Sequence, residues 1–60
     1  MLVRVKIYWT EDSVTKEQSE NLPAVPQVGD FIRTNTGYEN IVATRRWLLD
    51  GPPIVHLVLN

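Results

Sequence analysis

Cysteine is absent from this chain of 60 residues, and histidine occurs only once, as His56. Without cysteine no disulfide can form, and one imidazole cannot complete the four-ligand shell of a structural zinc ion. We therefore expect no metal and no cofactor. The last apolar stretch, residues 54–59, is about a third as long as a membrane span requires. No contact with a membrane is expected either.

The chain is short enough to form only one domain, residues 1–60. A domain of this size buries about 60% of the surface that its unfolded chain exposes. Its free energy of unfolding is then on the order of a few kcal/mol, and small domains are usually reinforced by disulfides, a metal or a partner subunit. Since the sequence offers neither of the first two, we expect self-association, most simply as a homodimer.

The balance of residue types is that of a folded globular protein, with 43% hydrophobic and 22% charged residues and a net charge of −1. The first residues do not resemble a signal peptide, because Arg4 and Lys6 interrupt any apolar segment. Together with the absence of cysteine, this favours a cytoplasmic protein.

Residues 2–9 show the clearest pattern in the chain. Apolar and polar side chains alternate with a period of two, and many are β-branched, which predicts a half-buried strand. The face predicted to point inward consists of Val3, Val5, Ile7 and Trp9.

Residues 10–22 are polar and admit two interpretations. In the first, residues 11–13 form a turn and residues 14–18 return as a polar edge strand, or the segment is a long ordered loop. In the second, Thr15 caps a short helical turn with Gln18 as its reciprocal partner. We favour the hairpin or loop, because the segment lacks an apolar helical stripe.

Prolines at positions 23 and 26 exclude a helix or a central strand from residues 22–27. This connector should run extended, and with residues 10–22 it makes up the part of the domain outside the core strands. Gly29 then permits a tight turn, in which Asp30 accepts backbone N–H bonds. Residues 31–34 follow as a strand, and residues 35–37 as a turn with positive φ at Gly37.

Two further strands are expected at residues 38–49 and 54–59. In the first, apolar side chains fall on both faces, which indicates either two covered faces or a β-bulge. The second is nearly all apolar and should be central in the sheet or lie at a subunit contact. Trp9 and Trp47 are predicted to fill the core, with Trp47 the more exposed of the two because it follows two arginines.

These segments predict an all-β fold, an SH3-like small barrel or a strongly bent antiparallel sheet of four to five strands. The chain resembles the SH3-like small barrels in the order of its features. These are a Pro-x-Val-Gly-Asp turn that enters a strand, a Gly-Tyr hairpin, a Trp and a last apolar strand. Short bacterial and phage-encoded proteins built on such barrels show a similar pattern. The residues that carry this resemblance are Pro26, Val28, Gly29, Asp30, Ile32, Gly37, Tyr38, Trp47 and Leu57.

The resemblance implies binding to peptides, nucleic acids or other copies, and no particular activity. The acidic, aromatic-rich groove of peptide-binding SH3 domains has no counterpart here, because Glu11 and Asp12 precede no paired aromatic residues. We therefore do not expect a domain that binds proline-rich peptides.

Cations and aromatic rings form the one candidate binding surface in the sequence. Arg4, Lys6 and Tyr8 share the outward parity of the first strand, and Arg33 or Arg46 could join them. Cations follow phosphates and aromatic rings stack on bases in proteins that bind single-stranded nucleic acid. The ordinary alternative is a solvated strand face. The candidate residues are Arg4, Lys6, Tyr8, Arg33, Arg45, Arg46 and Trp47.

No catalytic constellation is recognisable. His56 lies between apolar neighbours without a nucleophile or an orienting carboxylate in its motif, and the acids of residues 11–20 lack the spacing of a calcium loop. We therefore expect no enzyme and no small-molecule substrate. The leading hypothesis is a protein-binding adaptor or accessory protein, of phage-derived type, that self-associates or binds another protein. The alternative is weak binding of single-stranded nucleic acid.

Overall fold

A computed structural model describes residues 1–60 and contains five strands and no helix. No segment therefore forms a helix that could cross a membrane. The strands are β1 (Val3–Glu11), β2 (Val14–Leu22), β3 (Phe31–Arg33), β4 (Glu39–Leu48) and β5 (Ile54–Leu59).

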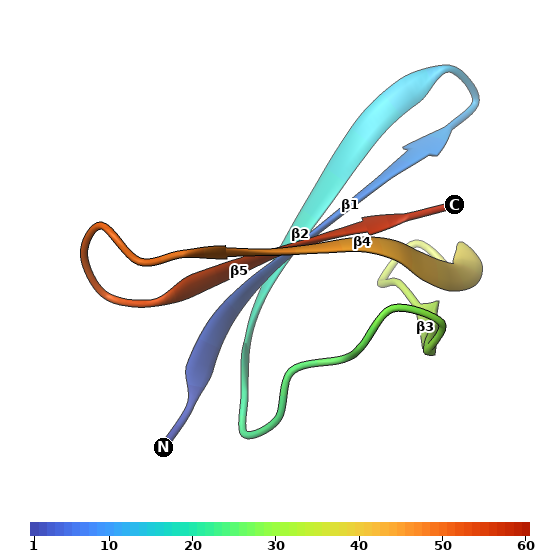
Figure 1. Cartoon of the computed structure of the whole chain (residues 1–60). Coiled ribbons are helices and arrows are strands. Elements are labelled where there is room, and N and C mark those ends of the chain that lie inside the picture. The colour runs from blue at the N-terminus through green and yellow to red at the C-terminus, as the bar shows by residue number, and fades with distance from the viewer.

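All five strands belong to one sheet in the order β2-β1-β5-β4-β3. The sheet curls strongly, and the β3–β4 hairpin folds across one of its faces to give a half-barrel (Figure 1). We call the enclosed side the inner face and the opposite side the outer face. The expected all-β fold with a strongly bent sheet is confirmed.

β1 and β2 form a long hairpin that pairs Val3 with Leu22 at one end and Glu11 with Val14 at the other. Its two-residue turn has positive φ at Asp12 (52°) and Ser13 (65°). Two such residues define the type I′ turn that matches the twist of a hairpin. The hairpin interpretation is thus confirmed, although β2 continues to Leu22 rather than ending at Gln18.

One pairing differs from the expected antiparallel sheet. β5 runs parallel to β1, with Val5 opposite Val55 and Ile7 opposite Leu57. Parallel neighbours need a long connection, and here the intervening hairpins and connector supply it. β5 thereby lies between β1 and β4, which explains why nearly every residue of this strand is apolar.

A β-bulge in β4 resolves the mixed parity of residues 38–49. Val42 lies opposite Leu59 and Thr44 opposite Val58, so that Ala43 is the extra residue. Of the two alternatives for this segment, two covered faces or a β-bulge, the structure shows the bulge. Before it, the even-numbered residues of β4 face inward, and after it the odd-numbered residues do.

The Val-Gly-Asp segment forms a turn that is attached to β4. The Asp30 amide donates to the Gln27 carbonyl (3.0 Å), and Gly29 has a φ of 97°. The Asp30 carboxylate accepts from the Gln27 amide (2.8 Å), as predicted. Backbone bonds from Gly29 to Val42 and from Val42 to Asp30, each 2.9 Å, bind the turn to β4 at the bulge.

The β3–β4 connection consists of residues 34–38 and is closed by two backbone hydrogen bonds. Thr34 donates its amide to the Tyr38 carbonyl (2.8 Å) and accepts from Gly37 (3.0 Å), whose φ is 89°. The positive φ predicted for Gly37 is confirmed. The strands are shorter than expected, because Thr34 and Tyr38 already belong to this loop closure.

The core lies between the inner face of the sheet and the segments that cross it. Its buried members are Val5, Ile7, Trp9, Val42, Val55, Leu57 and Leu59. The inward face predicted for β1 is correct, with Val3 packed at the margin. Trp9 is buried as expected, whereas the core position predicted for Trp47 is wrong, because its side chain is 43% exposed.

Candidate functional site

The outer face of the sheet brings cations from two strands together. Lys6 of β1 lies opposite His56 of β5, which lies opposite Arg46 of β4. Side chains at paired positions point to the same face of a sheet. This row therefore aligns two cations with an imidazole between them, and we call it the basic row.

Arg4 and Tyr8 flank Lys6 on the same face of β1, because residues two apart in a strand share a face. The rings of Tyr8 and His56 meet edge to face, with their centroids 5.2 Å apart. Arg4 and Arg46 are exposed, and neither they nor Lys6 forms an ion pair with a carboxylate. The outer face thus presents unpaired cations next to an aromatic pair.

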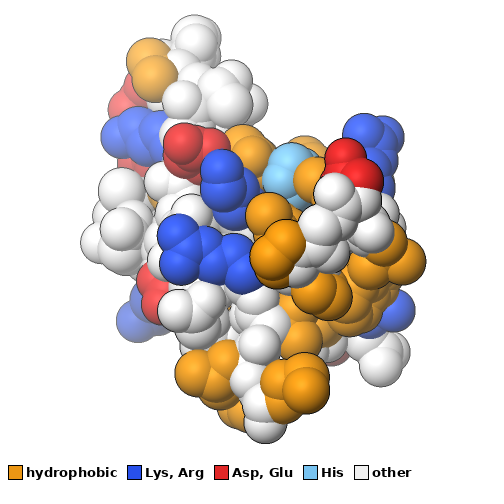
Figure 2. All heavy atoms as spheres, turned by 90° about the vertical axis from the view of Figure 1, so that its left-hand side faces the viewer, with side chains coloured by type: hydrophobic (Ala, Val, Ile, Leu, Met, Phe, Trp, Pro, Cys, Tyr) orange, Lys and Arg blue, Asp and Glu red, His pale blue; other side chains and the backbone are white.

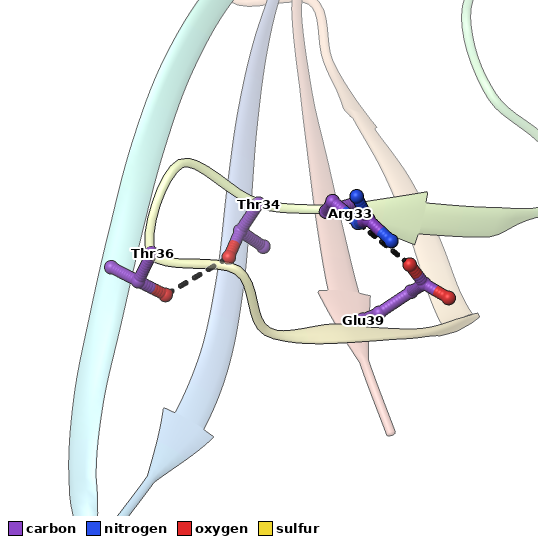
Figure 3. Close-up of polar contacts among 4 residues, drawn as sticks. All are labelled: Arg33, Thr34, Thr36 and Glu39. Carbon is purple, nitrogen blue, oxygen red and sulfur yellow. Dashed lines mark hydrogen bonds and ion pairs between the residues drawn. The ribbon is translucent and has the colours of Figure 1, made fainter.

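Arg33 lies apart from the basic row. It pairs with Glu39 where β3 meets the start of β4, and its guanidinium contacts the Glu39 carboxylate at 2.8 Å (Figure 3). The pair is solvent-exposed, and such pairs contribute about 0–1 kcal/mol. Of the two arginines, Arg46 lies in the same row as Lys6, with His56 of β5 between them, and Arg33 does not.

Arg45 and Trp47 lie on the opposite side of the sheet from Arg46. After the bulge they pair with Leu57 and Val55, whose side chains form the core. β3 pairs only with Glu39–Ile41, so the edge of β4 that faces away from β5 has no strand partner in this half. Trp47 and Leu49, 43% and 69% exposed, occupy the uncovered margin.

On the molecular surface, hydrophobic and basic side chains lie next to each other. Seen from the side of the β4–β5 turn, hydrophobic side chains gather into a broad region that borders several Lys and Arg side chains and the only histidine (Figure 2). We call the margin made by Arg45, Trp47 and Leu49 the apolar rim.

A hydrogen-bonded chain closes the half-barrel on its inner side. The hydroxyls of Thr34 and Thr36 lie 3.0 Å apart (Figure 3), and Thr36 donates to Glu11 (2.9 Å). Glu11 also accepts from the indole of Trp9 (3.0 Å). The Trp9 and Thr36 donors hold the pKa of the Glu11 carboxyl below its ordinary value of 4.5. Gln18 adds a second link by accepting from the Asn35 amide (2.8 Å).

A shallow groove of about 390 Å³ lies between the connector and β3. Its lining residues are Ala24, Val25, Pro26, Asp30, Phe31 and Ile32. Phe31 is 65% exposed. The carboxylate in the lining, Asp30, is engaged by the Gln27 amide and serves the turn.

Two residues of these surfaces could not be singled out from the sequence. His56 lies between apolar neighbours in the sequence, and its place in the basic row depends on the parallel register of β1 and β5. Leu49 follows the last residue of β4, and its position just before the Asp-Gly-Pro turn was the available signal.

Comparison of the chain with protein families, with curated proteins and with solved structures gives no match. No group of three or more His, Asp or Glu side chains is placed to hold a metal ion. The geometry of the chain offers two candidate surfaces, the basic row and the apolar rim.

Proposed function

We propose that this protein is a small non-catalytic interaction module that binds another protein through the apolar rim. The observation that carries the proposal is the exposure of Trp47, near the end of β4, and of Leu49, just after it. Here β4 pairs with β5 on one edge, and β3 does not reach the other edge. Burial of a tryptophan would stabilise a domain of 60 residues. Trp47 nevertheless stays at the surface.

The composition of the rim supports a protein partner. Trp and Arg are enriched among the residues that contribute most to protein–protein binding, where they are surrounded by contacts that exclude water. Arg45 and Trp47 are two residues apart on one face of β4, and Leu49 extends the same margin. The half-barrel is compatible with an SH3-like fold, and an adaptor or accessory role in the cytoplasm, of phage-derived type, belongs to this proposal.

A capture experiment with matched baits tests it. Immobilised wild-type protein should retain a partner that Trp47→Ala loses by at least tenfold and Leu49→Ser also weakens. Val28→Ser removes another exposed apolar side chain, from the turn before β3, and should retain the partner. If Trp47→Ala captures the same proteins in the same amounts as the wild type, the rim is not the binding surface.

Weak binding of single-stranded nucleic acid is a second candidate, and the basic row favours it. Lys6 and Arg46 would contact phosphates, and the Tyr8 ring offers a surface for a base. Residues two apart in a strand are spaced by about 6.6 Å, so Arg4 and Lys6 present successive cations along an extended backbone.

An amide NMR titration with a mixed-sequence oligonucleotide distinguishes this candidate. Shifts should be confined to the neighbourhood of Arg4, Lys6, Tyr8 and Arg46 and should weaken with salt. Replacing Arg46 by Ala should reduce the slope of log affinity against log salt by about one. Arg33→Ala removes a cation that is already paired with Glu39, and it should leave this slope unchanged. No shift at low salt would exclude the candidate.

A further inference from the structure

The free edge of β2 is the longest unpaired strand edge in the molecule. β2 pairs only with β1 and lies at the end of the sheet (Figure 1). Such an edge is a template for pairing with another chain. Its nine residues make it as long as β1, while β3 at the opposite end has three.

The geometry of the β1–β2 hairpin shows which backbone N–H and C=O groups of β2 are free to pair with another strand. In a two-residue type I′ hairpin the residues that flank the turn form a hydrogen-bonded pair, and such pairs recur at every second position. Glu11–Val14 is that pair, so the even-numbered residues of β2 bond to β1. The groups that point away from β1 belong to Thr15, Glu17, Ser19 and Asn21, and none has a backbone or side-chain partner.

We propose that the free edge of β2 pairs with the same edge of a second copy, antiparallel and centred on Gln18. A two-fold axis at Gln18 places Lys16 of each copy opposite Glu20 of the other copy. Thr15 then faces Asn21 of the second copy and Glu17 faces Ser19, so that each outward-pointing residue meets another that can exchange hydrogen bonds with it.

Charge complementarity selects this register from its neighbours. Centring the pair on Glu17 would place two Glu17 carboxylates directly opposite, which is destabilising. Centring it on Ser19 would place Lys16 opposite Leu22 and Gln18 opposite Glu20. Only the Gln18 centre among these three makes opposite charges meet on both sides of the axis.

The ends of β2 agree with the same register. Val14 is 55% exposed in the single chain, and the Gln18 centre places it opposite Leu22 of the second copy. Glu20 already accepts from the Gln18 amide at 2.9 Å, which directs its carboxylate along the strand toward the axis. The pairing reinforces a small domain in the way that its size requires, and it does not depend on the binding partner of the apolar rim.

Charge reversal tests the register by sedimentation velocity from micromolar to millimolar concentration. The wild type should sediment as a dimer, and Lys16→Glu and Glu20→Lys should each sediment as monomers. The double variant, which restores opposite charges with reversed polarity, should be a dimer again. Asp50→Lys, an equal charge change in the exposed β4–β5 turn, should remain a dimer. A wild type that is monomeric up to millimolar concentration, or single variants that dimerise like the wild type, would overturn the proposal.

Hydrogen exchange of the wild type provides a test that no unfolded variant can obscure. The amides of Thr15, Glu17, Ser19 and Asn21 should exchange slowly at high protein concentration and rapidly on dilution. The amides of β1 should change far less, because they bond within the chain. Rapid exchange of the four β2 amides at every concentration would contradict the dimer.

Discussion

Glu11 joins the end of β1 to the β3–β4 loop through a single carboxylate. It accepts hydrogen bonds from Trp9, on its own strand, and from Thr36, far along the chain. Both donors favour the charged form, which is why the pKa of this carboxyl is lowered from 4.5. Of the two side-chain links to the β3–β4 loop, the one through Glu11 is therefore favoured when this carboxyl is ionised, and the other is made by Gln18.

The lowered pKa of Glu11 predicts a pH dependence of stability. A carboxyl whose pKa is lower when folded stabilises the fold at pH values above about 4.5 and loses that contribution as the pH falls through the folded pKa. We expect Glu11→Gln to lower the urea midpoint of unfolding at neutral pH. On acidification, the midpoint of this variant should fall by less than that of the wild type. Glu17→Gln, on the outer face of β2, is the control. Equal acid-dependent losses in the wild type and Glu11→Gln would contradict this role.

At the scale of elements, the local sequence predicts the turns, but it predicts the β-bulge of β4 only in part. Gly37 and the Val-Gly-Asp turn were predictable, because positive φ requires particular residue types. The mixed parity of residues 38–49 indicated a bulge but not its position. That position decides that Arg46 faces outward with Lys6 while Arg45 and Trp47 face the opposite side, so the candidate residues could be chosen from the sequence but not assigned to faces.

The β3–β4 loop gives a prediction with a control inside the chain. Gly37 has a φ of 89°, and alanine there should cost about 1–2 kcal/mol because its Cβ crowds the backbone in the left-handed region. Gly51 has no positive φ and no atom within 4 Å of an added Cβ, so Gly51→Ala should leave the stability unchanged or slightly raised. Thermal or urea unfolding of both variants measures the difference, and equal losses would refute the assignment of the turn strain to Gly37.

At the scale of the whole molecule, the pairing of β1 with β5 was the feature that local patterns could not supply. The apolar run of residues 54–59 indicated a central strand or a subunit contact, and the strand is central. Its direction relative to β1 depends on how the connector and the hairpins lead the chain back, and these long-range contacts leave no period in the sequence. His56 joins Lys6 and Arg46 only because this pairing is parallel.

The central position of β5 makes its buried residues the most sensitive in the chain. Leu57 is fully buried between β1 and β4, and truncation of a buried leucine to alanine costs about 2–5 kcal/mol. Since a domain of this size has only a few kcal/mol of stability, Leu57→Ala should be largely unfolded at room temperature by circular dichroism and amide NMR. Val58→Ala, on the same strand but exposed on the outer face, should stay folded with a small loss. Because the two positions are adjacent, a difference in stability between the two variants arises from the face of β5 on which each side chain lies. A folded Leu57→Ala would mean that the core is not organised around this strand.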